Sequence, residues 1–163
     1  EVRLGSGLKV LQTGEADCIA IAGMGASTMI EILKADMPLA VEAKRLVLQP
    51  MAGAASLRKW LIQNGWHIVA EDLVADGRHL YEIMAVERGE SEAFSDAALE
   101  IGPSLIEAKH SLLAKQFARQ INNYKKLLAN MGKSEQARAS EKYIAWEKLV
   151  QELEALADAC NCK

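Results

Sequence analysis

Short apolar runs without a helical period alternate with helical patterns in the first sixty residues. Residues 18–22 are apolar throughout and two glycines end the run. Such a run is typical of a strand buried on both faces, as in a parallel sheet. Residues 27–33 then have helical spacing, and the same order recurs as a strand over 45–50 and a helix over 56–62. Strands joined by a helix pair in parallel with a right-handed crossover, so the pattern predicts an α/β fold.

Two further apolar runs, over 66–74 and 80–86, are joined by a segment that contains Asp76-Gly77, a strong hairpin signal. We therefore expect the sheet to end in an antiparallel pair of strands. Residues 2–4 have the pattern of a strand end. Residues 89–96 are polar and are predicted to form a linker.

Beyond the linker, the hydrophobic positions have a helical period throughout. One apolar stripe predicts a single helix from Ile106 to Met131, about 39 Å long at ~1.5 Å per residue. A second stripe, from Tyr143 to Cys160, has spacings of three and four residues, which is the heptad geometry of a coiled coil. The short turn between the stripes predicts an antiparallel coiled-coil hairpin, with Tyr143 and Trp146 in its seam.

The linker divides the chain into a predicted α/β domain over 1–89 and a predicted helical domain over 90–163. Charge is distributed unevenly along the chain. Residues 1–100 hold nine Lys and Arg against fifteen Asp and Glu, whereas residues 101–150 hold nine against four. A basic helical segment favours a polyanionic partner, although a solvated helix face would have the same composition.

Candidate chemistry lies at one edge of the predicted sheet. Parallel strands end at the same edge, where open α/β sheets bind ligands, so residues 22–25 and Gln49-Pro50 are expected to lie together there. Gly23 and Gly25 permit a sharp turn and close approach of a ligand to the backbone. The Gln49 amide offers a donor and an acceptor, which suits a nucleobase edge, and the proline holds residue 49 extended. The alternative is a strand end that the proline simply closes.

Other function classes find little support in the sequence. The motifs of P-loop nucleotide hydrolases, zinc hydrolases and α/β-hydrolases do not occur. No apolar run approaches the ~20 residues of a membrane helix, and three cysteines without a framework fit a reducing, cytoplasmic compartment. Cys160 and Cys162 have the spacing of half a metal site, but no partner pair is near in sequence, so we expect no metal. The three histidines, His67, His79 and His110, are expected to be structural or exposed.

Several motifs occur in an order that resembles one enzyme family. They are Ile19–Gly25 (IAIAGMG), Arg45–Pro50 (RLVLQP), Leu57–Leu61 (LRKWL), Tyr81–Ile83 (YEI) and Ile101–Leu105 (IGPSL). Together they resemble the bacterial tRNA adenine-N1 methyltransferases, over nearly the whole chain. The resemblance implies a Rossmann-like class I methyltransferase domain that uses S-adenosyl-L-methionine, a C-terminal coiled-coil domain, and tRNA as the partner.

The resemblance also implies roles for particular residues. By position, the expected cofactor-binding residues are Ser6, Gly7 and Leu8 near the adenine, and Ala22, Gly23 and Met24 near the transferred methyl group. The expected catalytic residues are Gly25, Gln49 and Pro50. The expected tRNA-binding residues, on the basic segment, are Arg119, Lys125 and Lys126. The chain departs from the family where Ser6 replaces the usual Asp or Asn, where Ala26 replaces a common Gly, and where Met51 replaces a frequent Asn.

The family's first strand and its glycine-rich cofactor loop would precede residue 1. The resemblance therefore implies that this chain lacks the first two strands of the family fold and is inactive by itself. It also implies an open sheet edge through which copies of the chain can self-associate.

The implied reaction needs neither a metal nor a strong base, because adenine N1 has a lone pair at neutral pH and the sulfonium methyl group is already activated. Positioning can supply up to ~7–11 kcal/mol of such an acceleration. N1 lies on the Watson–Crick edge, so the base must be unpaired or flipped out. A carboxylate such as Glu82 would stabilise the cationic product, if it is not simply a surface strand residue. Two alternatives stay open: a methyltransferase for another RNA or a small molecule, and a non-catalytic coiled-coil interaction module.

Overall fold

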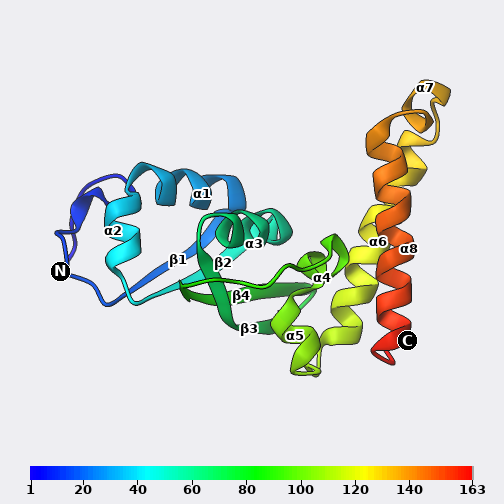
Figure 1. Cartoon of the computed structure of the whole chain (residues 1–163). Helices are drawn as coiled ribbons and strands as arrows, with labels where there is room; N and C mark the ends of the chain where they lie inside the picture. The colour runs from blue at the N-terminus through cyan, green and yellow to red at the C-terminus, as the bar shows by residue number, and fades with distance from the viewer. Residues whose placement is uncertain (163) are drawn as a thin grey trace. The chain divides into compact units, whose positions relative to one another are not determined.

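The computed structural model describes residues 1–162. Its contacts divide the chain into two compact units, Glu1–Ala93 and Phe94–Lys163, which are described separately below. The first unit is α/β and the second is entirely helical (Figure 1). Within the described residues, no helix combines the length and the apolar character that a membrane span requires.

A four-stranded sheet with the order β1-β2-β4-β3 forms the centre of the first unit. β1 (Cys18–Gly25) and β2 (Arg45–Ala52) are parallel. β3 (Trp66–Asp76) and β4 (His79–Arg88) form an antiparallel hairpin, and β4 pairs with β2. This mixed sheet confirms both the parallel pair and the terminal hairpin predicted from the sequence.

Three helices pack on this sheet because their apolar stripes match one of its faces. They are α1 (Ala26–Ala35), α2 (Met37–Glu42) and α3 (Ala54–Gln63), and a short 3-10 helix, η1 (Gly7–Val10), precedes β1. The fully buried side chains of the resulting core include Met29, Leu33, Leu46, Leu48, Leu57, Leu61, Trp66, Met84 and Val86. Burial of large aliphatic and aromatic side chains, at roughly 1.5–3 kcal/mol each, is the main stabilising contribution to this unit.

β1 differs from the prediction of a strand buried on both faces. Ile19 and Ile21 are buried, but Cys18, Ala20 and Ala22 are exposed. The physical reason is the position of the strand: it pairs only with β2 among the described residues, and the helices cover only one face of it. An apolar run of small residues thus formed a strand with one buried face.

Residues 2–4 do not form the predicted strand end. They have no regular secondary structure, and Val2 and Leu4 are fully exposed. A strand needs a neighbouring strand to satisfy its backbone groups, and the described part of the chain offers none at the outer edge of β1.

The helical unit contains α4 (Asp96–Ile101), α5 (Pro103–Glu107), α6 (Leu113–Met131), α7 (Glu135–Arg138) and α8 (Glu141–Ala159). The prediction of one continuous helix from residue 106 to residue 131 was wrong. Lys109 has a left-handed conformation, with φ 48°, which ends the preceding turn. The His110 ring then accepts a hydrogen bond from the Leu112 N–H at 3.1 Å, and α6 begins one residue later. Its 19 residues span about 28 Å at ~1.5 Å per residue.

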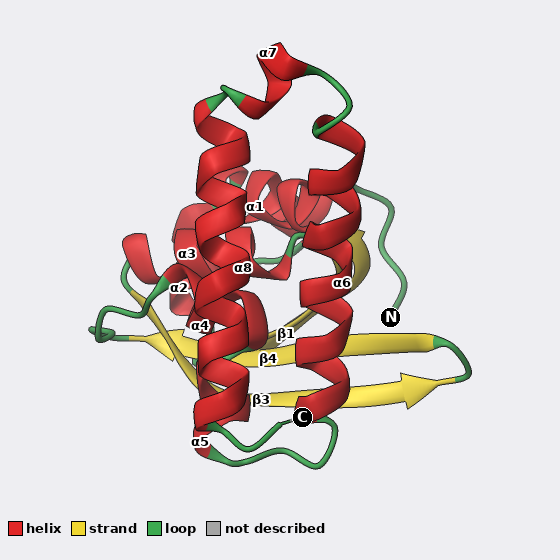
Figure 2. Ribbon diagram, turned by 90° about the vertical axis from the view of Figure 1, so that its right-hand side faces the viewer, coloured by secondary structure: helices red, strands yellow, loops and turns green. Residues whose placement is uncertain are grey.

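The two long helices, α6 and α8, lie side by side and run in opposite directions (Figure 2). Val150, Leu153 and Ala157 are buried at heptad spacing on α8. Trp146 contacts Tyr124 of the facing helix edge to face, with ring centroids 5.7 Å apart. Knobs-into-holes packing, which defines a coiled coil, stays a prediction for this pair.

Candidate active site

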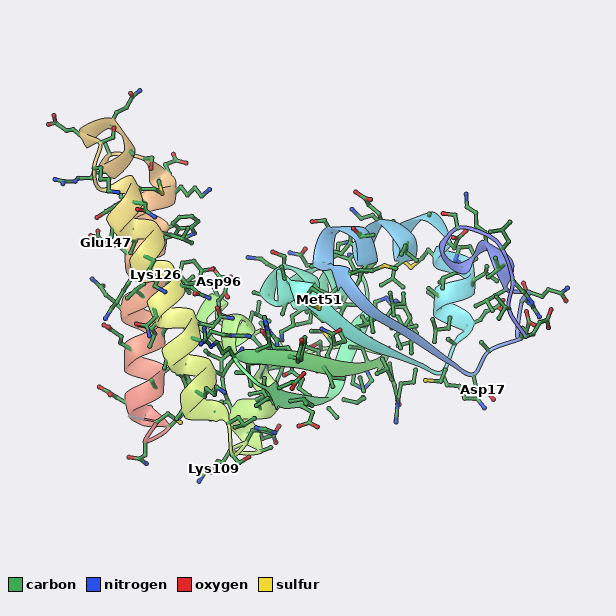
Figure 3. The ribbon with its side chains drawn as sticks, turned by 180° about the vertical axis from the view of Figure 1, so that it is seen from behind. Asp17, Met51, Asp96, Lys109, Lys126 and Glu147 are labelled. Atoms are coloured by element: carbon green, nitrogen blue, oxygen red, sulfur yellow. The ribbon has the colours of Figure 1, made fainter. Side chains whose placement is uncertain are left out.

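The carboxyl ends of β1 and β2 meet at one edge of the sheet. The strand register pairs Ala22 with Gln49, Met24 with Pro50, and Gly25 with Ala52. Asp17 precedes β1 at the opposite end of these strands, and Met51 marks the end of β2 (Figure 3). The structure therefore brings together the residues that the sequence placed at this edge, and their roles in binding and catalysis stay predictions.

Two helices, α1 and α3, begin at this same edge of the sheet. Gly25 precedes α1 and Gly53 precedes α3. Gly53 has a left-handed conformation, with φ 76°, and a Cβ atom at this position would lie 3.1 Å from the Ala26 Cβ. A glycine is needed here both for the turn from strand to helix and for the close approach of α1 and α3.

The edge has room for a ligand beside its glycines. A Cβ atom at Gly23 or at Gly25 would meet no other atom within 4 Å. Met24 and Met51 are 41% and 55% exposed, so two flexible apolar side chains border this space. Open backbone flanked by thioethers suits the approach of a flat, partly apolar molecule.

The Gln49 side chain is engaged within the protein. Its Oε1 accepts a hydrogen bond from the Gly23 N–H at 3.0 Å. Its Nε2 donates to the Pro50 carbonyl at 3.2 Å and approaches the Met51 sulfur at 3.6 Å. The amide acceptor that the sequence suggested for reading a nucleobase is thus bonded to the neighbouring strand.

Ser6, Gly7 and Leu8 do not lie at this edge. A Cβ atom at Gly7 would lie 3.2 Å from the Ile32 side chain, late in α1, whereas the edge is at the start of that helix. Seven residues separate Gly25 from Ile32, or about 10 Å along a helix. Ser6 and Gly7 are exposed and Leu8 is part of the core. The structure does not bring these three residues together with Ala22, Gly23 and Met24.

A buried ionic cluster is the feature that the sequence reasoning missed. The Arg58 guanidinium, on α3, donates to Glu71 Oε1 at 2.6 Å and to Glu82 Oε2 at 2.8 Å, and all three side chains are buried. Burial acts to lower the pKa of Arg58, but the charges and hydrogen bonds of Glu71 and Glu82 outweigh it and raise the pKa above its usual value. Arg58 therefore carries its positive charge at neutral pH.

The cluster also corrects the interpretation of Glu82. This residue is 6% exposed, so it is not a surface strand residue. The register that pairs Leu48 with Met84, continued by two residues, sets Glu82 opposite Pro50. The Glu82 carboxylate is thus buried near the end of β2 and bonded to Arg58. It is not available as a free carboxylate for a bound base.

The three predicted RNA-binding residues have different environments on α6. Lys126 is exposed and, within residues 1–162, forms no ion pair. Lys125 pairs with Glu154 of α8 at 2.6 Å, so part of its positive charge is already neutralised. Arg119 is only half-buried. The exposed Lys115 lies eleven residues before Lys126, which is three helical turns, so these two lysines share the face of α6 that points away from α8.

Metal-binding chemistry has no visible centre in the part of the chain that the structure describes. No group of three or more His, Cys, Asp or Glu side chains there is arranged to hold an ion. Cys18, Cys160 and Cys162 are free thiols.

Comparisons with known proteins place these features in a family. Residues 1–154 match the model of the family described as tRNA (adenine(22)-N(1))-methyltransferase. The Bacillus subtilis tRNA (adenine(22)-N(1))-methyltransferase is 32% identical over 127 residues, covering 75% of this chain and 53% of that protein. A crystal structure of a protein of the NADB-Rossmann superfamily from Streptococcus agalactiae superposes with a TM-score of 0.82 at 29% identity, covering 96% of this chain and 67% of that one.

A Streptococcus pneumoniae protein crystallised with S-adenosyl-L-methionine superposes with a TM-score of 0.79 at 25% identity, covering 96% of this chain and 67% of that one. The chain thus spans about half the length of the Bacillus subtilis protein that it matches. The α/β unit has the Rossmann-like fold of these methyltransferase structures, with a mixed sheet. The resemblance inferred from the sequence motifs is confirmed: the chain belongs to the tRNA (adenine(22)-N(1))-methyltransferase family.

Proposed function

We propose that the protein transfers a methyl group from S-adenosyl-L-methionine to N1 of an adenine in tRNA, at the edge formed by Gly23–Gly25 and Gln49-Pro50. The observation that carries the proposal is this glycine-lined strand edge in a chain that belongs to the family over residues 1–154. The description of the family points to adenine 22 as the target. We propose that residues 1–89 carry out methyl transfer and that a coiled coil within residues 90–163 docks the RNA.

Part of the expected cofactor site fits the structure. Gly23, Met24 and Gly25 leave open space at the strand end, which suits the end of the cofactor that carries the reactive methyl group. S-adenosyl-L-methionine supplies an activated sulfonium methyl group there. Ser6, Gly7 and Leu8 lie elsewhere in this chain, near the end of α1, and a role for them beside the cofactor's adenine stays a prediction.

The chain's own residues contribute mainly by positioning. The adenine N1 lone pair would form the new bond to the methyl carbon while the bond from that carbon to the sulfonium sulfur breaks. S-adenosyl-L-homocysteine would leave as a neutral thioether, and the positive charge would pass to the product base. Such a reaction gains up to ~7–11 kcal/mol from orientation alone. Met24 and Met51, both exposed at the edge, would contact the two faces or the rim of the flipped base. Pro50, buried beside them, would fix the end of β2.

The outer face of α6 is the proposed tRNA-docking surface, defined by Lys115 and Lys126. A lysine that binds a tRNA phosphate adds roughly one to the slope of log K against log salt, because it displaces a counterion. Replacing both lysines with glutamine should therefore weaken tRNA binding and lower this slope by about two. Lys148, which already pairs with Glu152 at 3.4 Å, provides the matched control. Equal effects from Lys148→Gln would contradict a docking role for α6.

The experiment that tests the reaction uses the natural full-length protein, labelled S-adenosyl-L-methionine and an unmodified tRNA transcript, followed by nucleoside analysis. Label is expected in N1-methyladenosine, and not in a transcript that has guanosine at position 22. Label in a different nucleoside would change the target, and no transfer to any tRNA would overturn the proposed function.

A further inference from the structure

A single side chain connects the two strand ends of the candidate site. Gln49 Oε1 accepts from the Gly23 N–H at 3.0 Å, across from β2 to β1. The same side chain donates from Nε2 to the Pro50 carbonyl at 3.2 Å and reaches the Met51 sulfur at 3.6 Å. Gln49 therefore bonds both to the glycine turn of β1 and to the exit of its own strand.

The Gly23 N–H is available for this bond because the strand ladder is interrupted there. Ala22 pairs with Gln49 and Met24 pairs with Pro50, so Gly23 is an extra residue on β1 without a partner on β2. It has a left-handed conformation, with φ 75°, as expected of a glycine at a bulge. On β2, Pro50 has no N–H with which to continue a ladder. The sequence of each strand thus stops regular pairing, and the Gln49 side chain replaces the missing acceptor.

We infer that Gln49 is a positioning residue, whose carbonyl oxygen fixes the Gly23 bulge and so sets the direction in which Met24 and Gly25 present their backbone at the site. The inference rests on the proposed function for its effect on methyl transfer. It differs from the expectation drawn from the sequence, in which the Gln49 amide reads the adenine edge directly. The acceptor that such reading would use is bonded to Gly23, and the amide nitrogen, which has two hydrogens, donates toward the Pro50 carbonyl and the Met51 sulfur.

A positioning role needs the side-chain oxygen of Gln49, whereas base reading needs the N–H donor of its amide. Gln49→Glu keeps an oxygen that accepts from the Gly23 N–H but loses the amide donor. Gln49→Met has a similar length and loses both. A positioning role predicts that the glutamate variant rescues what the methionine variant loses, whereas base reading through the amide donor predicts that both variants lose turnover alike. Gln63→Met, an exposed position at the end of α3, is the matched control.

The first measurement is the Gly23 amide in nitrogen-15 NMR spectra of the chain, which needs no cofactor and no activity. The Gln49→Met variant is expected to shift the Gly23 amide proton upfield and to speed its hydrogen exchange roughly two- to tenfold, the range for one hydrogen bond. Gln49→Glu and Gln63→Met should leave the exchange near that of the unmodified chain. A Gly23 amide that does not respond to Gln49→Met would overturn the inference.

The second measurement is kinetic and uses the natural full-length protein. Gln49→Met is expected to lower kcat roughly two- to tenfold while the KM for S-adenosyl-L-methionine stays within about twofold, and Gln49→Glu should recover most of kcat. Loss of kcat in Gln49→Glu as large as in Gln49→Met, with the Gly23 bond intact, would assign the amide donor to the substrate and overturn the inference. If the unmodified protein transfers no methyl group, the proposed function fails, while the NMR result decides the Gly23 bond by itself.

Discussion

Replacing Arg58 with methionine tests whether the buried ionic cluster stabilises the α/β unit. The substitution keeps most of the side-chain volume but removes the positive charge that holds Glu71 and Glu82. Both carboxylates are buried, and Arg58 bonds to them at 2.6 and 2.8 Å. The buried carboxylates of Glu71 and Glu82 would then remain close together without the positive charge of Arg58.

The expected loss is large for one substitution. Removing one partner of a buried ion pair costs about 3–5 kcal/mol, because a charge that water does not reach loses its counter-charge. Total stabilities of domains are typically ~5–15 kcal/mol, so the loss is a substantial share of the whole. With a slope of about 2 kcal/mol per molar urea, the unfolding midpoint of the unit should fall by about 2 M.

The assay is urea unfolding at pH 7, followed by tryptophan fluorescence in a Trp146→Phe background, in which Trp60 and Trp66 report on the α/β unit alone. Arg78→Met, at the exposed hairpin turn, is the control for loss of an arginine.

A triple variant separates the cost of unpaired charge from the cost of poorer packing. Arg58→Met combined with Glu71→Gln and Glu82→Gln removes every charge of the cluster, and it should recover more than half of the loss. A loss below about 1 kcal/mol in the single variant, as for an exposed ion pair, would refute the reasoning. A triple variant no more stable than the single variant would show that packing, and not charge, was responsible.

Three further expectations follow from the structure. Gly53→Ala should destabilise the α/β unit by about 1–2 kcal/mol in urea unfolding, because alanine is strained at φ 76° and its Cβ would lie 3.1 Å from that of Ala26; an unchanged midpoint would contradict this. The pKa of Tyr124 is raised by burial and by the hydrogen bond that the Tyr124 hydroxyl donates to Glu100 at 2.6 Å. Above pH 10, an ultraviolet titration should therefore show one tyrosine that ionises at a higher pH than the others. Tyr124→Phe should abolish that late phase. The outer edge of β1 has no strand partner within residues 1–162, so light scattering should detect concentration-dependent association that Ala20→Lys reduces; a monomer at all concentrations would exclude it.

The parts of the fold that the sequence predicted correctly are encoded locally. Asp76-Gly77 specifies a tight turn, and the alternating residues on either side of it specify two strands. The glycines that end β1 are likewise a local signal, and they located the open edge of the candidate site. The break at Lys109 and His110 has no such signal, because the apolar stripe continues across it. The hydrogen bond of Gln49 to Gly23 depends on the register between two strands, which no pattern within either strand contains.

Two members of the ionic cluster, Arg58 and Glu82, could have been predicted from the periodicity of the sequence. Glu82 has the same parity along β4 as the buried Leu80, Met84 and Val86, and Arg58 lies on the stripe of α3 that contains Ala54 and Leu61. A charged residue at a core position on each element is a detectable sign that the two form a buried pair.

Glu71 was hidden from that approach by a bulge in β3. The register shifts between Ile68 and Ala70, so the face that holds Trp66 and Ile68 continues at Glu71 and Leu73. Strict alternation from Trp66 would have put Glu71 on the opposite face of the sheet. Because of the bulge, Glu71 lies on the same face of the sheet as Glu82, and both carboxylates contact the guanidinium of Arg58. Val69 is the unpaired residue of the bulge, so its deletion would leave Ile68 opposite Val86 and Glu71 opposite Met84 on the same face of the sheet. We therefore expect that variant to keep the ionic cluster and to lose clearly less stability than Arg58→Met in the same urea assay, and an equal loss would contradict this account of the register.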